Sequence, residues 1–222
     1  MRQRFKDRYD AGRRLADQLT QYQGRDDLLV LGLPRGGVPV AFEVARALDA
    51  PFDIFLVRKL GVPGREELAM GAIASGGVRV LNQEVVDQLR ISSAVLDHVA
   101  EVERRELRRR AEAYRGNRPE PEIEDHTVIL VDDGLATGAT MRAAIVALRQ
   151  RNPKRIVVAV PTASSETCAQ FEDEVDEIVC AITPDPFFGV GLWYEDFAQT
   201  TDQEVRQLLA QAANGVSTPT TG

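Results

Sequence analysis

The chain has 222 residues, with 27 Lys and Arg against 34 Asp and Glu, and a formal net charge of −7. An acidic chain is a poor candidate for binding a nucleic-acid backbone, whereas 44% hydrophobic residues suffice for a buried core. No apolar run reaches the ~18 residues of a membrane helix, and the N-terminus lacks the apolar stretch of a signal peptide. We therefore expect a soluble, cytoplasmic, globular protein without nucleic-acid or membrane partners.

The first part of the chain alternates between helical and strand patterns. Residues 4–22 carry apolar side chains at helical spacing, and residues 28–33 form a continuous apolar run typical of a strand buried on both faces. A Gly-rich turn leads into a helical pattern over 38–48, and a second apolar run covers 52–57. Strand, turn, helix and strand together predict a βαβ unit.

The middle of the chain interrupts this alternation. Residues 70–81 predict two strands joined by a turn, and residues 83–115 predict helices with a break near 91–93. Glutamates alternate with five arginines in the second helical stretch, which favours an ion-paired, solvated helix face over a nucleic-acid surface. These arginines are Arg104, Arg105, Arg108, Arg109 and Arg110.

The alternation then resumes and completes the predicted fold. We expect strands over 127–131, 155–160 and 174–180, and helices over 139–151 and 164–171. Alternating strands and helices predict an α/β protein with an open, mostly parallel sheet flanked by helices. We expect one domain over 1–214, with a helical insertion at about 82–118, and a disordered tail over 215–222.

The cysteines and histidines offer little chemistry. Cys168 and Cys180 are too few for a disulfide framework or a metal set, and we expect both to be small buried hydrophobic residues. His98 lies in a predicted helix and His126 precedes a predicted strand, so neither is expected to bind metal or to act as a base.

The loop after the strand at 127–131 is the most informative segment. Asp132 and Asp133 stand at the carboxyl end of that strand, and small residues then open a helix. The backbone N–H groups of 134–138 and the helix dipole can together hold an anion. Two carboxylates beside a phosphate site require hydroxyl groups or a divalent cation. Sugar hydroxyls next to a phosphate, with Mg²⁺ nearby, suit both halves of the loop better than an ordinary βα turn does.

Residues 128–140 resemble the signature of the type I phosphoribosyltransferases, which is an apolar strand, two acids, three variable residues, Thr-Gly and a nearby Thr. The resemblance implies a small hood beside the parallel sheet. It also implies that Asp132 and Asp133 bind the ribose hydroxyls of phosphoribosyl pyrophosphate (PRPP) and bind the cofactor Mg²⁺, either directly or through water. The residues implied to hold the 5′-phosphate are Gly134, Leu135, Ala136, Thr137, Gly138, Ala139 and Thr140.

A second segment matches the pyrophosphate loop of this family. Arg35, Gly36 and Gly37 follow the first predicted strand, where close backbone approach to an anion requires glycine and an arginine can pair with phosphate. Arg58 and Lys59 follow the next apolar run, as in several members of the family that use them to reach PRPP phosphates.

The stretch over 60–67 resembles the mobile catalytic loop of the family. Gly61, Pro63 and Gly64 suit a lid that closes to exclude water. Glu66 and Glu67 are both candidates for the catalytic glutamate that the adenine-specific members carry in this loop. The spacing does not choose between them.

Several positions depart from the members that use 6-oxopurines. Ala136 stands where those members have an aspartate, residues 158–161 contain no lysine, and Trp193 replaces another aspartate. The identity of the accepting base therefore stays open. The aromatic candidates for stacking on it are Phe187, Phe188, Trp193 and Tyr194.

Residues 5–210 resemble more closely a branch known as predicted phosphoribosyltransferases, through LGLPRGGVPVA, VRKLGVPGREELAMGAIA, VDDGLATGATMRAA and WYEDF. The resemblance implies transfer of the phosphoribosyl group of PRPP to a nitrogenous base, or the reverse, with release of pyrophosphate, in nucleotide salvage. It also implies a homodimer. The alternative is a non-catalytic PRPP-binding regulator that keeps the acidic loop without a working lid. Hydrolase chemistry is disfavoured because no Gly-x-Ser-x-Gly elbow occurs.

Overall fold

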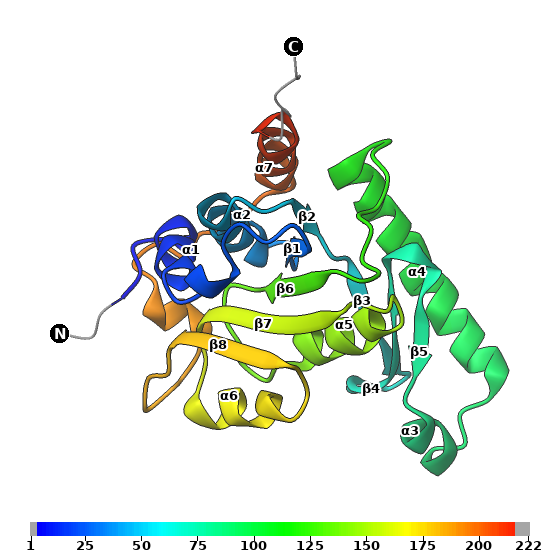
Figure 1. Cartoon of the computed structure of the whole chain (residues 1–222). Coiled ribbons are helices and arrows are strands. Elements are labelled where there is room, and N and C mark those ends of the chain that lie inside the picture. Colours follow the sequence, from blue (N-terminus) through cyan, green and yellow to red (C-terminus); the bar gives the residue numbers. More distant parts are fainter. Residues whose placement is uncertain (1–3, 216–222) are drawn as a thin grey trace. The chain divides into compact units, whose positions relative to one another are not determined.

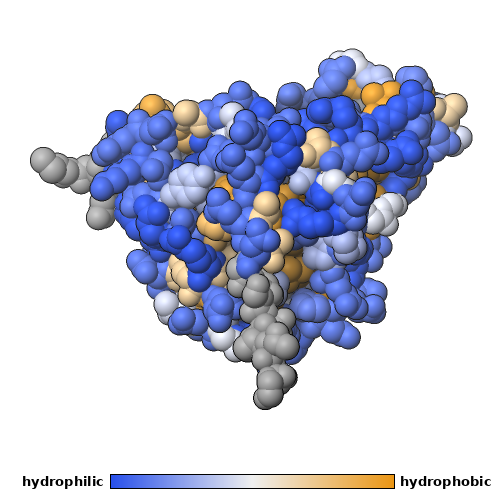
Figure 2. All heavy atoms as spheres, turned by 90° about the horizontal axis from the view of Figure 1, so that it is seen from above, coloured by the Kyte–Doolittle hydropathy of each residue, from blue (hydrophilic) through white to orange (hydrophobic). Residues whose placement is uncertain are grey.

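The computed structural model describes residues 4–215, which group into two compact units. Among the described residues, the first unit comprises 4–54, 122–137 and 153–215, and the second comprises 55–121 and 138–152. None of the helices within 4–215 is long and apolar enough to cross a membrane. Hydrophilic residues dominate the face seen in Figure 2, and hydrophobic residues occupy small areas between them.

The first unit is built on a five-stranded parallel sheet with the strand order β2-β1-β6-β7-β8 (Figure 1). Every residue of the neighbouring strands β1 and β6 is buried, which explains their uninterrupted apolar sequences. The strands are β1 (Leu28–Gly32), β2 (Phe52–Ile54), β6 (Thr127–Val131), β7 (Arg155–Thr162) and β8 (Glu177–Ile182).

Helices of the first unit pack against this sheet. Apolar side chains of the two N-terminal helices form one core with alternate residues of three strands, such as Val30, Ile129 and Val157. The regular helices are α1 (Arg8–Ala16), α2 (Gly37–Leu48), α6 (Ser165–Glu172) and α7 (Asp202–Gly215), and 3₁₀ turns cover Thr20–Tyr22 and Val190–Trp193.

The second unit contains a three-stranded antiparallel sheet in the order β3-β4-β5. The helices α4 and α5 both pack against β3 and β4 (Figure 1). The elements are β3 (Val57–Val62), β4 (Arg65–Ala74), β5 (Arg79–Leu81), α3 (Gln83–Gln88), α4 (Ser93–Arg115) and α5 (Ala139–Arg149), with a 3₁₀ turn at Ser75–Gly77.

The predicted α/β fold with a mostly parallel sheet is confirmed, and so is the ion-paired face of α4. Glu101 accepts from Arg104 at 2.7 Å, and Glu106 accepts from Arg109 and from Arg110 at 2.8 Å each. Hydrogen bonds from Arg109 and Arg110 hold the pKa of Glu106 down at about 2.

Three predicted elements differ from the structure. The helix expected over 4–22 is only α1 and a 3₁₀ turn, because Phe5 instead forms a β-bridge with Tyr194. The strand expected over 52–57 divides into β2 and β3, which belong to different sheets. The loop expected over 60–67 is a hairpin of β3 and β4 that turns at Gly64, with φ +77°.

The tail predicted over 215–222 starts at the last residue of α7, and residues 216–222 lie outside the described residues.

Cys168 is buried as expected, whereas Cys180 is only half-buried, and neither stays a separate thiol. Cys168 of α6 and Cys180 of β8 form a disulfide. The two elements are consecutive in the chain and pack against each other, which brings residues 12 positions apart to a Cα–Cα distance of 6.8 Å. The number of cysteines in the sequence does not reveal that these two lie close together in the fold.

Candidate functional site

In the first unit, the acidic loop and the glycine turn lie side by side. Because β1 and β6 are parallel neighbours, their carboxyl ends meet at one edge of the sheet, with Gly32 opposite Val131. The Leu33 N–H donates to the Val131 carbonyl oxygen at 2.9 Å. The turn after β1 and the acid pair after β6 are thus held at the same edge.

Glycine is required in this turn by the closeness of the acids. A Cβ atom at Gly36 would overlap the carboxylate of Asp133. A Cβ atom at Gly37 would lie 2.8 Å from the Asp132 Cα and 2.6 Å from the Val131 carbonyl oxygen. Because Gly37 also begins the 12-residue helix α2, the turn presents N–H groups and the positive end of a helix dipole next to the acid pair.

Asp132 is partly buried and lies against its neighbour. Its Oδ1 accepts from the backbone N–H of Asp133 at 2.8 Å. Burial, and then the adjacent Asp133 carboxylate, raise the pKa of Asp132 well above its ordinary value of 3.8.

Asp133 is held by partners that the sequence analysis did not identify. Arg8 donates to its Oδ2 from Nε at 2.9 Å, and Arg8 Nη2 lies 2.8 Å from the same oxygen. Burial raises the pKa of Asp133, and the Arg8 guanidinium opposes that rise. The hydroxyl of Tyr194 donates to the Asp133 carbonyl oxygen at 2.6 Å.

The loop after the acids combines anchored and exposed residues. Leu135 is buried, and its N–H donates to the Thr162 carbonyl oxygen at 2.9 Å. At Gly134, with φ +158°, a Cβ atom would lie 2.9 Å from that same oxygen. The two residues that follow, Ala136 and Thr137, are exposed.

The last three residues of the predicted phosphate loop belong to the second unit. Gly138, with φ +71°, is the N-cap residue of the 11-residue helix α5. Ala139 and Thr140 form its exposed first turn. A small-residue helix start of this kind suits a phosphate group.

Each cationic candidate has an acidic neighbour in its own unit. Arg35 Nη1 lies 3.5 Å from Asp202 Oδ1 in the first unit. In the second unit, Arg58 Nε donates to a Glu103 carboxylate oxygen at 2.6 Å. Side chains at the protein surface form ion pairs worth roughly 0–1 kcal/mol, so such pairs exchange readily for a stronger anion.

Lys59 and the two glutamate candidates surround the hairpin of the second unit. Lys59 Nζ donates to the Glu67 carbonyl oxygen at 3.2 Å and lies 3.7 Å from the Glu67 carboxylate. The Glu66 carboxylate accepts from the N–H of Gly64 at 3.1 Å and so supports the hairpin turn. The side chain of Glu67 is fully exposed.

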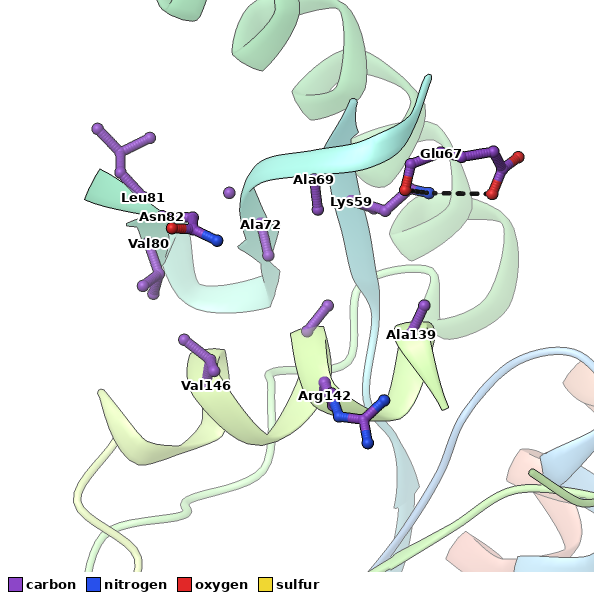
Figure 3. A pocket seen from close by; sticks show the side chains of 12 residues that line it. Lys59, Glu67, Ala69, Ala72, Val80, Leu81, Asn82, Ala139, Arg142 and Val146 are labelled. Carbon is purple, nitrogen blue, oxygen red and sulfur yellow. Dashed lines mark hydrogen bonds and ion pairs between the residues drawn. The ribbon is translucent and has the colours of Figure 1, made fainter. Parts of the chain in front are cut away.

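A cavity of about 420 Å³ lies within the second unit, between its sheet and α5. Figure 3 shows Lys59 and Glu67 joined at one end, Val80 and Asn82 at the other, and Ala139 on α5. Small and apolar side chains provide most of the lining. The volume falls within the roughly 300–1,000 Å³ of small-molecule sites.

The four aromatic candidates lie in different environments. Tyr194 is buried between Phe5 and Phe197, with ring centroids 5.4 and 4.9 Å away. Trp193 is also buried, whereas Phe187 is half-buried and Phe188 is 75% exposed. Only the last two have ring surface available for stacking. Base stacking by any of the four stays a prediction.

The described residues do not form a resident metal centre. Within 4–215, no group of three or more His, Cys, Asp or Glu side chains gathers in a way that could hold a metal ion. Asp132 and Asp133 provide two carboxylates, and one of these is engaged by Arg8. Direct ligation of Mg²⁺ by the acid pair alone is therefore a poor fit.

A parallel sheet with an acid pair after β6 and a glycine turn after β1 has the architecture of the type I phosphoribosyltransferase fold. The family model for the phosphoribosyl transferase domain matches residues 3–195, and the chain belongs to this family.

Relatives of known sequence and structure agree with this membership. The chain is 49% identical over 208 residues to a Mycobacterium tuberculosis protein named "Putative phosphoribosyl transferase", covering 94% of this chain and 47% of the relative. The chain thus spans about half the length of the curated relatives it matches first. It is 44% identical to the protein in the crystal structure of TT1426 from Thermus thermophilus, with a TM-score of 0.85 and coverage of 94% of this chain and 98% of that one.

Proposed function

We propose that this domain transfers the 5-phosphoribosyl group between PRPP and a nitrogenous base, in nucleotide salvage. One observation carries the proposal: Asp132 and Asp133 lie directly against the Gly36-Gly37 turn, at the carboxyl edge of the sheet. Hydroxyl acceptors and anion-binding N–H groups are thereby adjacent, as a sugar that carries phosphates requires.

The proposed roles follow from the chemistry of each group. The acid pair accepts hydrogen bonds from the ribose hydroxyls, and the loop over 134–140 donates to the 5′-phosphate. Arg35, the glycine turn, Arg58 and Lys59 bind the pyrophosphate. As the bond from ribose C1 to the pyrophosphate oxygen breaks, a base nitrogen bonds to C1 and the leaving group keeps the electron pair. The protein contributes positioning and charge stabilisation.

Binding of PRPP at the cationic residues would replace the ion pairs described above. The diphosphate must replace Asp202 at Arg35, Glu103 at Arg58 and the Glu67 carboxylate at Lys59. A diphosphate carries more charge than one carboxylate, so this exchange is favourable. Mg²⁺ bound to the substrate would neutralise charge on the leaving group. We propose that the acid pair approaches this ion only through water, as is usual for Mg²⁺.

Glu67 is the better candidate for a catalytic glutamate. Glu66 supports the hairpin turn through Gly64, whereas Glu67 is exposed beside Lys59 at the cavity of the second unit. Ala136 provides no titratable group, so a residue of the β3–β4 hairpin would have to transfer the proton to or from the base. Phe188 is the most accessible ring for stacking on the base.

Isothermal titration with PRPP, with and without Mg²⁺, tests the proposal. A panel of purines, pyrimidines and nicotinate-like bases is then added while pyrophosphate release is monitored. Mg²⁺-dependent binding at micromolar concentrations and release with one base would support transfer and identify the acceptor. Binding without release for any base would support the regulator, and absence of PRPP binding would overturn both.

A further inference from the structure

Arg8 is a buried cation at the start of α1 and is only 9% exposed. Its guanidinium contacts Asp133 Oδ2 through Nε and Nη2, and its Nη1 donates to the Ala198 carbonyl oxygen at 2.6 Å. The ring of Phe197 stacks against it, with its centroid 4.0 Å from the Arg8 Cζ. A buried guanidinium is costly unless it is hydrogen-bonded and paired, and these contacts meet that requirement.

The residues around Arg8 are brought together by main-chain pairing between residue 5 and residues 193–195. Phe5 N–H donates to the Trp193 carbonyl oxygen, and Glu195 N–H donates to the Phe5 carbonyl oxygen, both at 2.8 Å. The pairing brings Arg8 and Tyr194 to Asp133 from adjoining segments, Arg8 on the carboxylate and Tyr194 on the carbonyl oxygen. Asp133 is therefore held at both its side chain and its main chain.

The glycine turn lies over this ion pair. A Cβ atom at Gly36 would overlap the Asp133 carboxylate and would lie 3.3 Å from Arg8 Nε. The predicted pyrophosphate turn, the second acid and Arg8 thus form one contiguous cluster. Arg8 contacts Oδ2 of Asp133, so Oδ1 is the carboxylate oxygen that Arg8 does not engage.

We propose that Arg8 is a positioning residue for ribose recognition: it fixes the Asp133 carboxylate so that Oδ1 accepts a ribose hydroxyl. The inference rests on the proposed function, because it assigns the sugar to the acid pair. Arg8 itself does not touch the sugar or the reacting atoms. Its loss should weaken ligands that contain ribose and spare a ligand that contains only phosphate.

The experiment compares Arg8→Met with Arg13→Met as a matched control. Arg13 lies on the same helix, but its side chain is 51% exposed and 3.7 Å from Glu43 rather than from the acid pair. Five ligands are titrated against each folded variant: PRPP, ribose 5-phosphate, its 2-deoxy analogue, its 3-deoxy analogue, and inorganic pyrophosphate. Thermal unfolding without ligand is measured in parallel.

We expect Arg8→Met to weaken PRPP and ribose 5-phosphate by about 10–100-fold, the scale of one charge-assisted hydrogen bond. Pyrophosphate affinity should fall clearly less, because pyrophosphate has no ribose hydroxyl for the Asp133 carboxylate to accept from. The preference for ribose 5-phosphate over one of the two deoxy analogues should largely disappear. Arg13→Met should behave as the wild type.

Two outcomes would overturn the role of Arg8: unchanged ribose preference in folded Arg8→Met, or an equal loss for pyrophosphate and ribose 5-phosphate. If Arg8→Met does not fold, Arg8→Lys decides. A lysine has one nitrogen where the guanidinium uses three, so a loss of several-fold confined to ribose ligands is expected, and no loss contradicts the proposal. Failure of the wild-type protein to bind PRPP would instead remove the proposed function.

Discussion

Arg8 and Asp133 stand 125 positions apart in the chain and form a buried ion pair beside the second acid. Asp132 and Asp133 are adjacent carboxyls whose pKa values burial raises, and Arg8 is the cation that opposes this for both. The ability of the pair to accept two hydroxyl groups therefore depends on a residue outside the signature motif.

Asp133→Asn should weaken PRPP binding by roughly 1–3 kcal/mol, the cost of one charge-assisted hydrogen bond. It should also lower the free energy of unfolding, because Arg8 would keep its buried position without an anion. Isothermal titration and denaturant unfolding measure the two effects. Asp97→Asn is the control, since Asp97 pairs with Arg79 at 2.8 Å in an exposed position outside the proposed site. Wild-type PRPP affinity in Asp133→Asn would remove the ribose assignment.

The affinity for PRPP should rise with pH over a range above the ordinary aspartate pKa of 3.8. The pKa values of Asp132 and Asp133 are both raised, so the protonated forms persist to higher pH than in an exposed aspartate. Ribose hydroxyls donate to the ionised form, and binding therefore strengthens as the pair loses its proton. Titrations with ribose 5-phosphate and with pyrophosphate across the same pH series separate this effect from titration of the ligand phosphates. If the ratio of the affinities for ribose 5-phosphate and pyrophosphate does not change with pH, the prediction is contradicted.

At the scale of elements, the two parallel strands β1 and β6 create the site by ending at the same edge of the sheet. The loops that follow them approach so closely that side chains are excluded from the turn. This contact places an anion-binding helix start beside two acids, which is the physical basis of the proposed sugar phosphate site.

Gly36→Ala should lower the affinity for both PRPP and pyrophosphate by at least about tenfold. The added Cβ would overlap the Asp133 carboxylate, so the turn or the acid must move. Gly24→Ala is the control: its Cβ would meet no atom within 4 Å, and its φ of +71° imposes only the generic strain of a substituted glycine. Equal affinities in the two variants would show that the turn does not contact the ligand.

The disulfide between α6 and β8 should contribute roughly 2–4 kcal/mol to the free energy of unfolding, as cross-links that close short loops do. The contribution is measured as the difference between oxidised and reduced protein in denaturant unfolding. Cys168→Ser is the control and should not respond to reduction. An identical midpoint for oxidised and reduced wild-type protein would contradict a stabilising cross-link.

At the scale of the whole molecule, the distribution of charge favours the binding of small anionic substrates over the binding of polyanions such as nucleic acids. The chain carries a net charge of −7, yet the glycine turn and the start of α5 provide local positive potential. The arginines of α4 do not form a second cationic surface, because Glu101 and Glu106 are paired with them.

We therefore expect no measurable binding of duplex DNA or single-stranded RNA at about 150 mM salt. Fluorescence anisotropy with labelled oligonucleotides measures this. The double variant Glu101→Gln, Glu106→Gln provides the positive comparison, because removing two carboxylates leaves the α4 arginines uncompensated and should produce weak, salt-sensitive binding. Tight binding by the wild-type protein would contradict the interpretation of α4 as a solvated, ion-paired face.

Local patterns in the amino-acid sequence were enough to predict the parallel α/β fold, the positions of the acid pair and glycine turn, and the family. A buried strand is a continuous apolar run, and an anion loop is a short string of small residues between a strand and a helix. Such features can be recognised in the sequence because residues that are close together in the chain create them.

Contacts between distant segments became visible only in the folded chain. Arg8 and Tyr194 reach Asp133 through the pairing of residues 5 and 194, and no periodicity records that pairing. The run over 52–57 predicts one strand but serves two sheets, and Cys168 meets Cys180 because α6 packs on β8. These contacts depend on packing of the whole chain, and for that reason the partner of the second acid emerged from the fold and not from the motif.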